Sequence, residues 1–73
     1  MSITPFLGDQ AFEPEHIEAM SVAFGKTCRA LDLNDRTDKL TEIVALNVIE
    51  LARRGILDPV ELTLATLEEL KAD

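Results

Sequence analysis

Apolar residues recur every three or four positions between residues 14 and 31, which predicts an amphipathic helix there. The repeating positions are Ile17, Met20, Phe24, Cys28 and Leu31. Pro14 suits the first helical position, where its missing N–H leaves no hydrogen bond unmade. Phe12 and Ile17 have the spacing of a hydrophobic staple, a contact that fixes how the chain enters a helix. We therefore predict a helix over about 14–31 that buries this stripe.

A second helix is predicted over about 38–54, with more apolar surface than one stripe needs. Most of its apolar residues fill a half-circle from Leu40 to Ile49 at about 100° per residue. Ile43 and Leu46 instead fall among the charged positions. This distribution predicts a central helix that is packed on two sides. Three residues of the preceding turn are candidate N-caps: Asp35, Thr37 and Asp38.

A short link separates this helix from the next one. Gly55 fits the left-handed position that ends many helices, and Leu51 and Ile56 have the spacing of the contact in a Schellman motif. Asp58 followed by Pro59 is typical of a helix start, with Asp58 as the N-cap. The two helices must therefore turn sharply against each other.

The third helix is predicted over about 59–71. Its apolar stripe is expected to contain Val60, Leu64, Leu67 and Leu70. Leu62 lies off this stripe, although its spacing from Leu57 is that of a second hydrophobic staple.

Residues 1–11 have no regular period, and Pro5 and Gly8 disfavour a stable helix there. Their apolar side chains favour an arm that lies across the helices. We predict an all-α fold in which an irregular N-terminal arm, residues 1–11, joins a single helical domain, residues 12–73. The domain is expected to be a compact three-helix bundle with helices over about 14–31, 38–54 and 59–71.

Size and charge limit how such a fold is stabilised. The chain has 73 residues, with 14 Asp and Glu against 7 Lys and Arg, and a net charge of −7. One Cys excludes an internal disulfide, and one Cys with one His cannot form a Cys/His metal cage. The acidity lies at the two ends, around a nearly neutral centre at residues 26–57. Because a helical core this small gains from burying more surface, we expect it to associate with a partner.

The sequence lacks the features of several functional classes. No apolar run reaches the roughly 18 residues of a membrane span, and the first ten residues lack the basic and apolar regions of a secretory signal. We therefore expect a cytoplasmic protein that binds no membrane. Its negative charge disfavours nucleic-acid binding. Neither Ser2 nor Ser21 lies in the Asp-Ser-Leu type of sequence that acyl carrier proteins use for attachment.

His16 and Cys28 are candidates for chemistry, and each has an ordinary structural interpretation. His16 could act as a metal ligand or general base with nearby carboxylates, but no second His or Cys is placed to complete a site. Cys28 falls on the apolar side of the first helix, where burial makes a thiol inert.

Arg53 and Arg54 form the densest basic point of the chain. A short Gly-containing link between two helices also occurs in helix-turn-helix DNA readers. Here, however, the following helix begins with Asp58 and Glu61, and carboxylates at that position repel phosphate. The arginines are expected to stabilise the end of their helix through its dipole.

Several short motifs together resemble a group of small, uncharacterised bacterial helical proteins. The resemblance covers about residues 12–70 and implies a bacterial, cytoplasmic, all-helical protein, without implying an activity. The motifs are Phe12-x-Pro14-Glu15, Ala23-Phe24, Cys28-x-x-Leu31, Val44-Ala45, Ile49-x-Leu51-Ala52-Arg53-Arg54-Gly55 and Asp58-Pro59.

We predict a non-enzymatic protein–protein interaction or regulatory module that needs no cofactor or metal. It is expected to bind a protein partner or to form a homodimer through the central helix. The predicted interaction face comprises Val22, Leu46, Ile49 and Leu62. Two alternatives stay open: a small-molecule or metal-binding domain centred on His16, and a nucleic-acid-binding regulator that uses Arg53 and Arg54.

Overall fold

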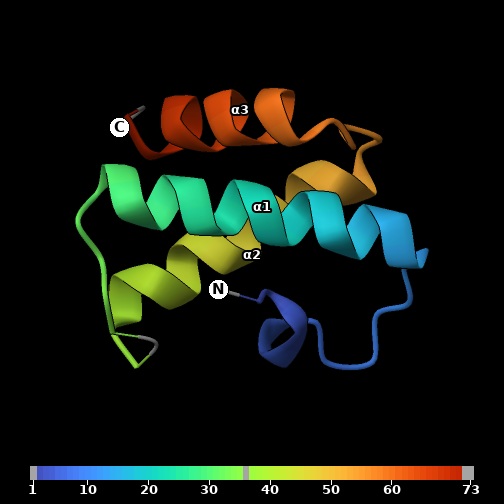
Figure 1. Ribbon diagram of the computed structural model, residues 1–73, viewed down its shortest axis with the longest axis horizontal. Coiled ribbons are helices and arrows are strands. Elements are labelled where there is room, and N and C mark those ends of the chain that lie inside the picture. Colours follow the sequence, from blue (N-terminus) through green and yellow to red (C-terminus); the bar gives the residue numbers. More distant parts are fainter. Residues whose placement is uncertain (1, 36, 72–73) are drawn as a thin grey trace.

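Three helices and one short 3-10 turn make up the computed structural model, which describes residues 2–35 and 37–71 (Figure 1). The elements are η1 (Thr4–Phe6), α1 (Pro14–Ala30), α2 (Lys39–Arg53) and α3 (Pro59–Lys71). Each helix packs against both of the others, and the described residues contain no strand. The predicted all-α three-helix bundle is confirmed, with helix boundaries within one residue of those expected.

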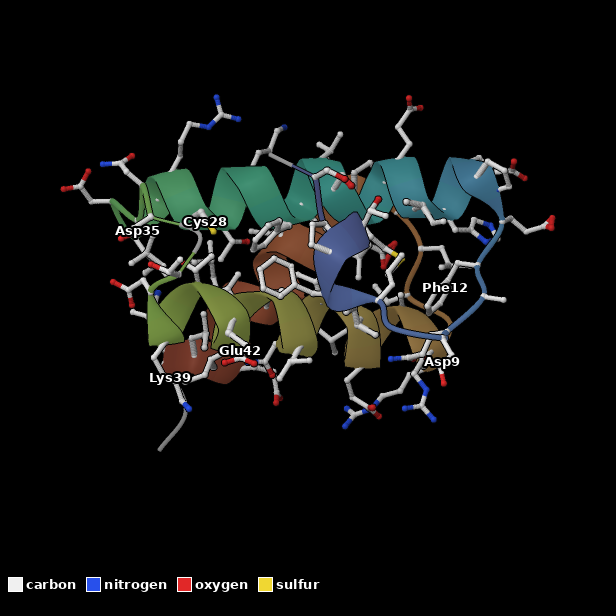
Figure 2. All side chains as sticks on the ribbon, turned by 90° about the horizontal axis from the view of Figure 1, so that it is seen from below. Asp9, Phe12, Cys28, Asp35, Lys39 and Glu42 are labelled. Atoms are coloured by element: carbon white, nitrogen blue, oxygen red, sulfur yellow. The ribbon has the colours of Figure 1, made fainter. Side chains whose placement is uncertain are left out.

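The elements surround one core. α1 crosses in front of α2 in Figure 1, α3 lies along one side of this pair, and η1 lies on the other side. Figure 2, seen from below, shows η1 in front of α1 and α2, between the two helices. α2 packs against α1, α3 and η1, but α1 also contacts both of the other helices, so α2 is not the one central helix that was predicted. The apolar residues that α2 has in excess of one stripe, Ile43 and Leu46, are exposed.

The N-terminal arm is part of the core. Ile3 and Leu7 are buried, and the backbone N–H of Ile3 donates to the Ser21 hydroxyl over 3.1 Å. Phe6 packs on Phe24 in an edge-to-face arrangement, with the ring centroids 5.5 Å apart and the ring planes at 68°. The expected packing of the arm on the helices is confirmed, and its residues 4–6 form the 3-10 turn η1.

Local capping interactions define the ends of α2 and α3. Asp38 caps α2 by accepting a hydrogen bond from the Leu40 N–H over 2.8 Å, which decides among the three candidates. Asp58 accepts hydrogen bonds from the first turn of α3, as predicted. At the end of α2, Gly55 has a φ of 101° and the Ile56 N–H donates to the Leu51 carbonyl over 3.1 Å. This is the predicted Schellman motif.

A second motif of this kind ends α1 and was not expected. Asp32 adopts a φ of 59°, and the Leu33 N–H donates to the Cys28 carbonyl over 2.8 Å. Asp tolerates the left-handed conformation better than most side chains. Because the chain turns here, Leu31 caps the helix and is exposed, so the prediction that it continues the buried stripe is wrong.

The predicted orientation of α3 is also wrong. Leu62 and Thr66 are buried, whereas Val60 and Leu64 are 57% and 62% exposed. Leu57 packs against the same core just before the helix, at the spacing from Leu62 that a hydrophobic staple has. The inner face also includes Thr66, which is fully buried although hydropathy ranks threonine as polar.

Threonine hydroxyls enter the core on all three helices. The Thr41 hydroxyl donates to the Asp35 carbonyl over 2.9 Å. The buried hydroxyls of Thr27 and Thr66 have no hydrogen-bond partner among the described residues. Such a group costs about 1–3 kcal/mol in lost hydration.

Candidate interaction surface

The four residues predicted as an interaction face do not share one surface. Val22 and Leu46 are exposed, on the outer faces of α1 and α2. Ile49 and Leu62 are buried. Helices that surround a common core turn their outer faces in different directions, so exposed residues on different helices need not meet. Of the four residues, only Leu46 is both exposed and part of α2, as was predicted.

The outer face of α2 carries a line of four exposed residues, which we call the α2 seam: Lys39, Ile43, Leu46 and Glu50. Their spacings of four, three and four residues keep them in line along a helix, as in coiled coils. Ile43 and Leu46, at the centre, are 41% and 50% exposed. Lys39 and Glu50 are exposed at the two ends. The seam thus has an apolar centre between opposite charges.

The α2 seam stands on a firmly anchored helix. The opposite face of α2 holds seven buried residues, namely Thr41, Val44, Ala45, Val48, Ile49, Leu51 and Ala52. Figure 2 shows Lys39 on the side of α2 that faces away from α1. The Asn47 amide beside the seam donates to the Ile43 carbonyl over 3.1 Å and so stays along its own helix. Leu40, expected in the buried half-circle, is 39% exposed and widens the apolar surface.

Charges at the C-terminal end of the α2 seam are loosely paired. Glu50 lies 3.5 Å from the Arg53 guanidinium and 3.4 Å from that of Arg54. All three side chains are about half exposed, with values between 49% and 60%. Exposed ion pairs of this kind contribute about 0–1 kcal/mol. Glu50 is therefore free to exchange these contacts for others.

A second apolar stripe lies on the outer face of α3. It consists of Val60, Leu64 and the half-buried Leu67, again at spacings of four and three. Glu61 and Glu68 are exposed one residue to the C-terminal side of Val60 and Leu67. α3 has two fully buried residues, whereas α2 has seven.

His16 and Cys28 lie too far apart to act together. His16 is half-buried in the first turn of α1, and Cys28 is buried twelve residues later, about 18 Å along the helix. Burial raises the pKa of the Cys28 thiol, which keeps it protonated and unreactive near neutral pH. Within residues 2–35 and 37–71, no three His, Cys, Asp or Glu side chains are placed to hold a metal ion.

Hydrogen bonds from Thr37 define the turn before α2. Its N–H and hydroxyl donate to the Asp35 carboxylate over 2.9 and 2.8 Å. These bonds lower the pKa of that exposed carboxyl. The arrangement is a local Asx-type turn that positions the start of α2.

The hollow beside the N-terminal arm lacks the groups of a catalytic site. It has a volume of about 430 Å³, lies between the arm and α2 and is lined by Gln10, Ala11, Phe12 and Arg53. Its only charged side chain is Arg53, so the hollow lacks the acid and base that proton-transfer chemistry requires. The outer face of α2, where apolar residues lie between opposite charges, is therefore the candidate interaction surface.

The ends of the α2 seam were not foreseen from the sequence. The hydropathy pattern does not distinguish Lys39 and Glu50 from the other solvent-facing charges of the helix. The signal that could have found them is the spacing of four, three and four residues on the polar half of the helix.

Comparisons with known proteins found no relative. No protein-family model matches the chain, and neither the curated proteins nor the solved structures include a significant match. The resemblance to small bacterial helical proteins therefore stays a prediction. None of the helices in the described part of the chain is both long and apolar enough to cross a membrane.

Proposed function

We propose that the protein is a non-enzymatic interaction module that binds a protein partner along the α2 seam. The observation that carries the proposal is the exposed pair Ile43 and Leu46 at the centre of the outer face of α2. The opposite face of the same helix is its most extensively buried one. A surface on an anchored helix loses little conformational freedom when a partner binds.

The residues of the seam have the arrangement of a small helix-binding surface. Apolar side chains at its centre would leave water on binding, whereas the charged ends would stay at the rim. Fully burying an exposed Leu or Ile contributes about 1.5–3 kcal/mol. Because Ile43 and Leu46 are about half buried already, each contributes about 1 kcal/mol, and the partner must also contact the flanks.

The geometry gives less support to the two alternatives. His16 has no clustered ligands among the described residues. Arg53 and Arg54 both lie beside Glu50, and Asp58 follows them at the start of α3. These carboxylates reduce the attraction of the arginines for phosphate.

Site-specific photocrosslinking in the source cells tests the proposal. A benzophenone side chain placed at position 46 is expected to form an adduct with a protein. The control places the same group at Leu64 of α3, a leucine that is 62% exposed against 50% for Leu46. An adduct formed at position 46 and not at 64 supports the α2 seam as the binding surface. No adduct at 46, or equal adducts at both positions, would overturn it.

A further inference from the structure

We propose that the partner at the α2 seam is a second copy of this chain, paired antiparallel so that Lys39 of each copy faces Glu50 of the other. This inference rests on the proposed function and names its partner. It follows from the order of charges along the seam and from the charge of the other faces.

The seam is complementary to itself in one antiparallel register. A two-fold axis between residues 43 and 46 sets Ile43 opposite the partner's Leu46. The same axis sets Lys39 opposite the partner's Glu50, because both pairs are centred on the same point of the helix. Two-fold symmetry makes each contact occur twice. The contact then has an apolar centre of four side chains and an ion pair at either end.

Two other arrangements of the seam bring like charges together. A parallel pairing sets Lys39 against the partner's Lys39 and Glu50 against the partner's Glu50. An antiparallel pairing centred on Leu46 sets Glu42 against the partner's Glu50. Repulsion between these like charges weakens both pairings, as charged flanking residues do in mismatched coiled coils. The charge order therefore disfavours these two arrangements, and the register proposed here is the one that pairs Lys39 with Glu50 of the partner subunit.

The charge of the whole chain also favours α2. With a net charge of −7, two copies repel each other at long range. The segment from 39 to 54 is an exception, with three basic and two acidic side chains. The stripe on α3, in contrast, lies beside Glu61 and Glu68, which would face their own counterparts in a self-pairing. α2 is thus the apolar face that a second copy can approach with least repulsion.

The existing contacts of Glu50 do not prevent this pairing. Its distances of 3.4 and 3.5 Å to the two arginines mark weak, exposed ion pairs. Lys39 makes no ion pair within the described residues and is exposed at the start of α2. A new contact between Lys39 and Glu50 of the partner subunit therefore displaces little.

The size of the contact predicts a weak dimer. α2 has 15 residues and is about 22 Å long. One helix face from each copy buries less than the roughly 1,600 Å² of a standard interface. Association is therefore expected at high micromolar concentration, where weak complexes become populated.

Sedimentation equilibrium of the full chain tests the proposal, from about 10 µM to about 1 mM. The variants are Lys39→Glu, Glu50→Lys and the double variant that carries both. We expect each single variant to weaken dimerisation about tenfold, because it creates two like-charge contacts per dimer. The double variant should recover most of the wild-type affinity, since it restores opposite charges at both ends. Lys26→Glu on the outer face of α1 is the control, with the same change of net charge as Lys39→Glu.

The results separate this inference from the proposed function. A wild-type chain that stays monomeric at about 1 mM would overturn self-pairing, whereas an adduct at position 46 with a different protein would leave the proposed function standing. A dimer that the double variant does not restore would overturn the Lys39–Glu50 register. A dimer weakened by Lys26→Glu as much as by Lys39→Glu would also overturn it. Circular dichroism of each variant confirms that the helices are intact.

Discussion

The backbone N–H of Ile3 donates a hydrogen bond of 3.1 Å to the hydroxyl of Ser21, in the middle of α1. The bond joins residues 18 positions apart and fastens the N-terminal arm to α1, where the arm lies between α1 and α2 (Figure 2). It places a polar group of the arm at a partly buried site, where an unpaired N–H is costly. The arm therefore helps to hold α2 in the position that presents its outer face.

Removing the Ser21 hydroxyl should loosen the arm. We expect Ser21→Ala to lower the free energy of unfolding by about 1–3 kcal/mol, because the Ile3 N–H loses its acceptor. Denaturant unfolding measures this change, and faster hydrogen exchange of the Ile3 amide would locate it. Ser2→Ala is the matched control, since among the described residues the Ser2 hydroxyl bonds only to exposed groups of Thr4. Equal losses in both variants would contradict a special role for the Ser21 contact.

Two leucines of α3 test the orientation of that helix. Leu62 is buried and Leu64 is 62% exposed, although the sequence stripe predicts the opposite. We expect Leu62→Ala to destabilise the fold by about 2–5 kcal/mol, as for other buried leucines. Leu64→Ala should change stability by less than about 0.5 kcal/mol. Thermal or denaturant unfolding of the two variants checks this, and a larger loss at Leu64 would show that α3 is rotated.

The buried threonines should respond differently to the loss of their hydroxyls. Thr27→Val and Thr66→Val remove hydroxyls that have no partner among the described residues, and are expected to raise stability by about 1 kcal/mol. Thr41→Val removes the bond to the Asp35 carbonyl and should lower stability by about 1 kcal/mol. Chemical denaturation compares the three variants. A loss of stability at all three positions would show that the hydroxyls of Thr27 and Thr66 do have partners.

Stability should depend on pH through Cys28. Burial raises the pKa of its thiol, so the folded chain holds the thiol proton more tightly than the unfolded chain. The stability that this tighter proton binding gives the fold is fully present below the ordinary thiol pKa of about 8.5. It is lost as the pH rises above that value. Unfolding measured between about pH 7 and 10 should therefore show a steeper decline for the wild type than for Cys28→Ala. Parallel declines would mean that the thiol titrates normally in the fold.

Local signals in the sequence were sufficient to predict where the helices begin and end. Asp58 and Gly55 act through the backbone groups next to them, so their effect depends little on the rest of the fold. The same holds for Asp38, although three neighbouring polar residues offered equivalent caps and only the structure distinguishes them.

Which face of a helix points inward is a tertiary property, and here sequence reasoning was less successful. A count of apolar residues assigned Val60 and Leu64 to the core of α3, whereas Thr66 takes that place. The candidate surface depends on the same information. Leu46 was correctly expected to lie among charged residues, but Ile49 and Leu62 could be placed only once the helices were packed.

A dilution series of amide chemical shifts tests the central claim most directly, because it shows which surface binds the second copy. Spectra of the ¹⁵N-labelled full chain would be compared between about 20 µM and 1 mM. Pairing along the α2 seam predicts concentration-dependent shifts at Lys39, Ile43, Leu46 and Glu50. The amides of Val60 and Leu64 on α3 should stay constant. Shifts confined to α3, or none at any concentration, would contradict the claim.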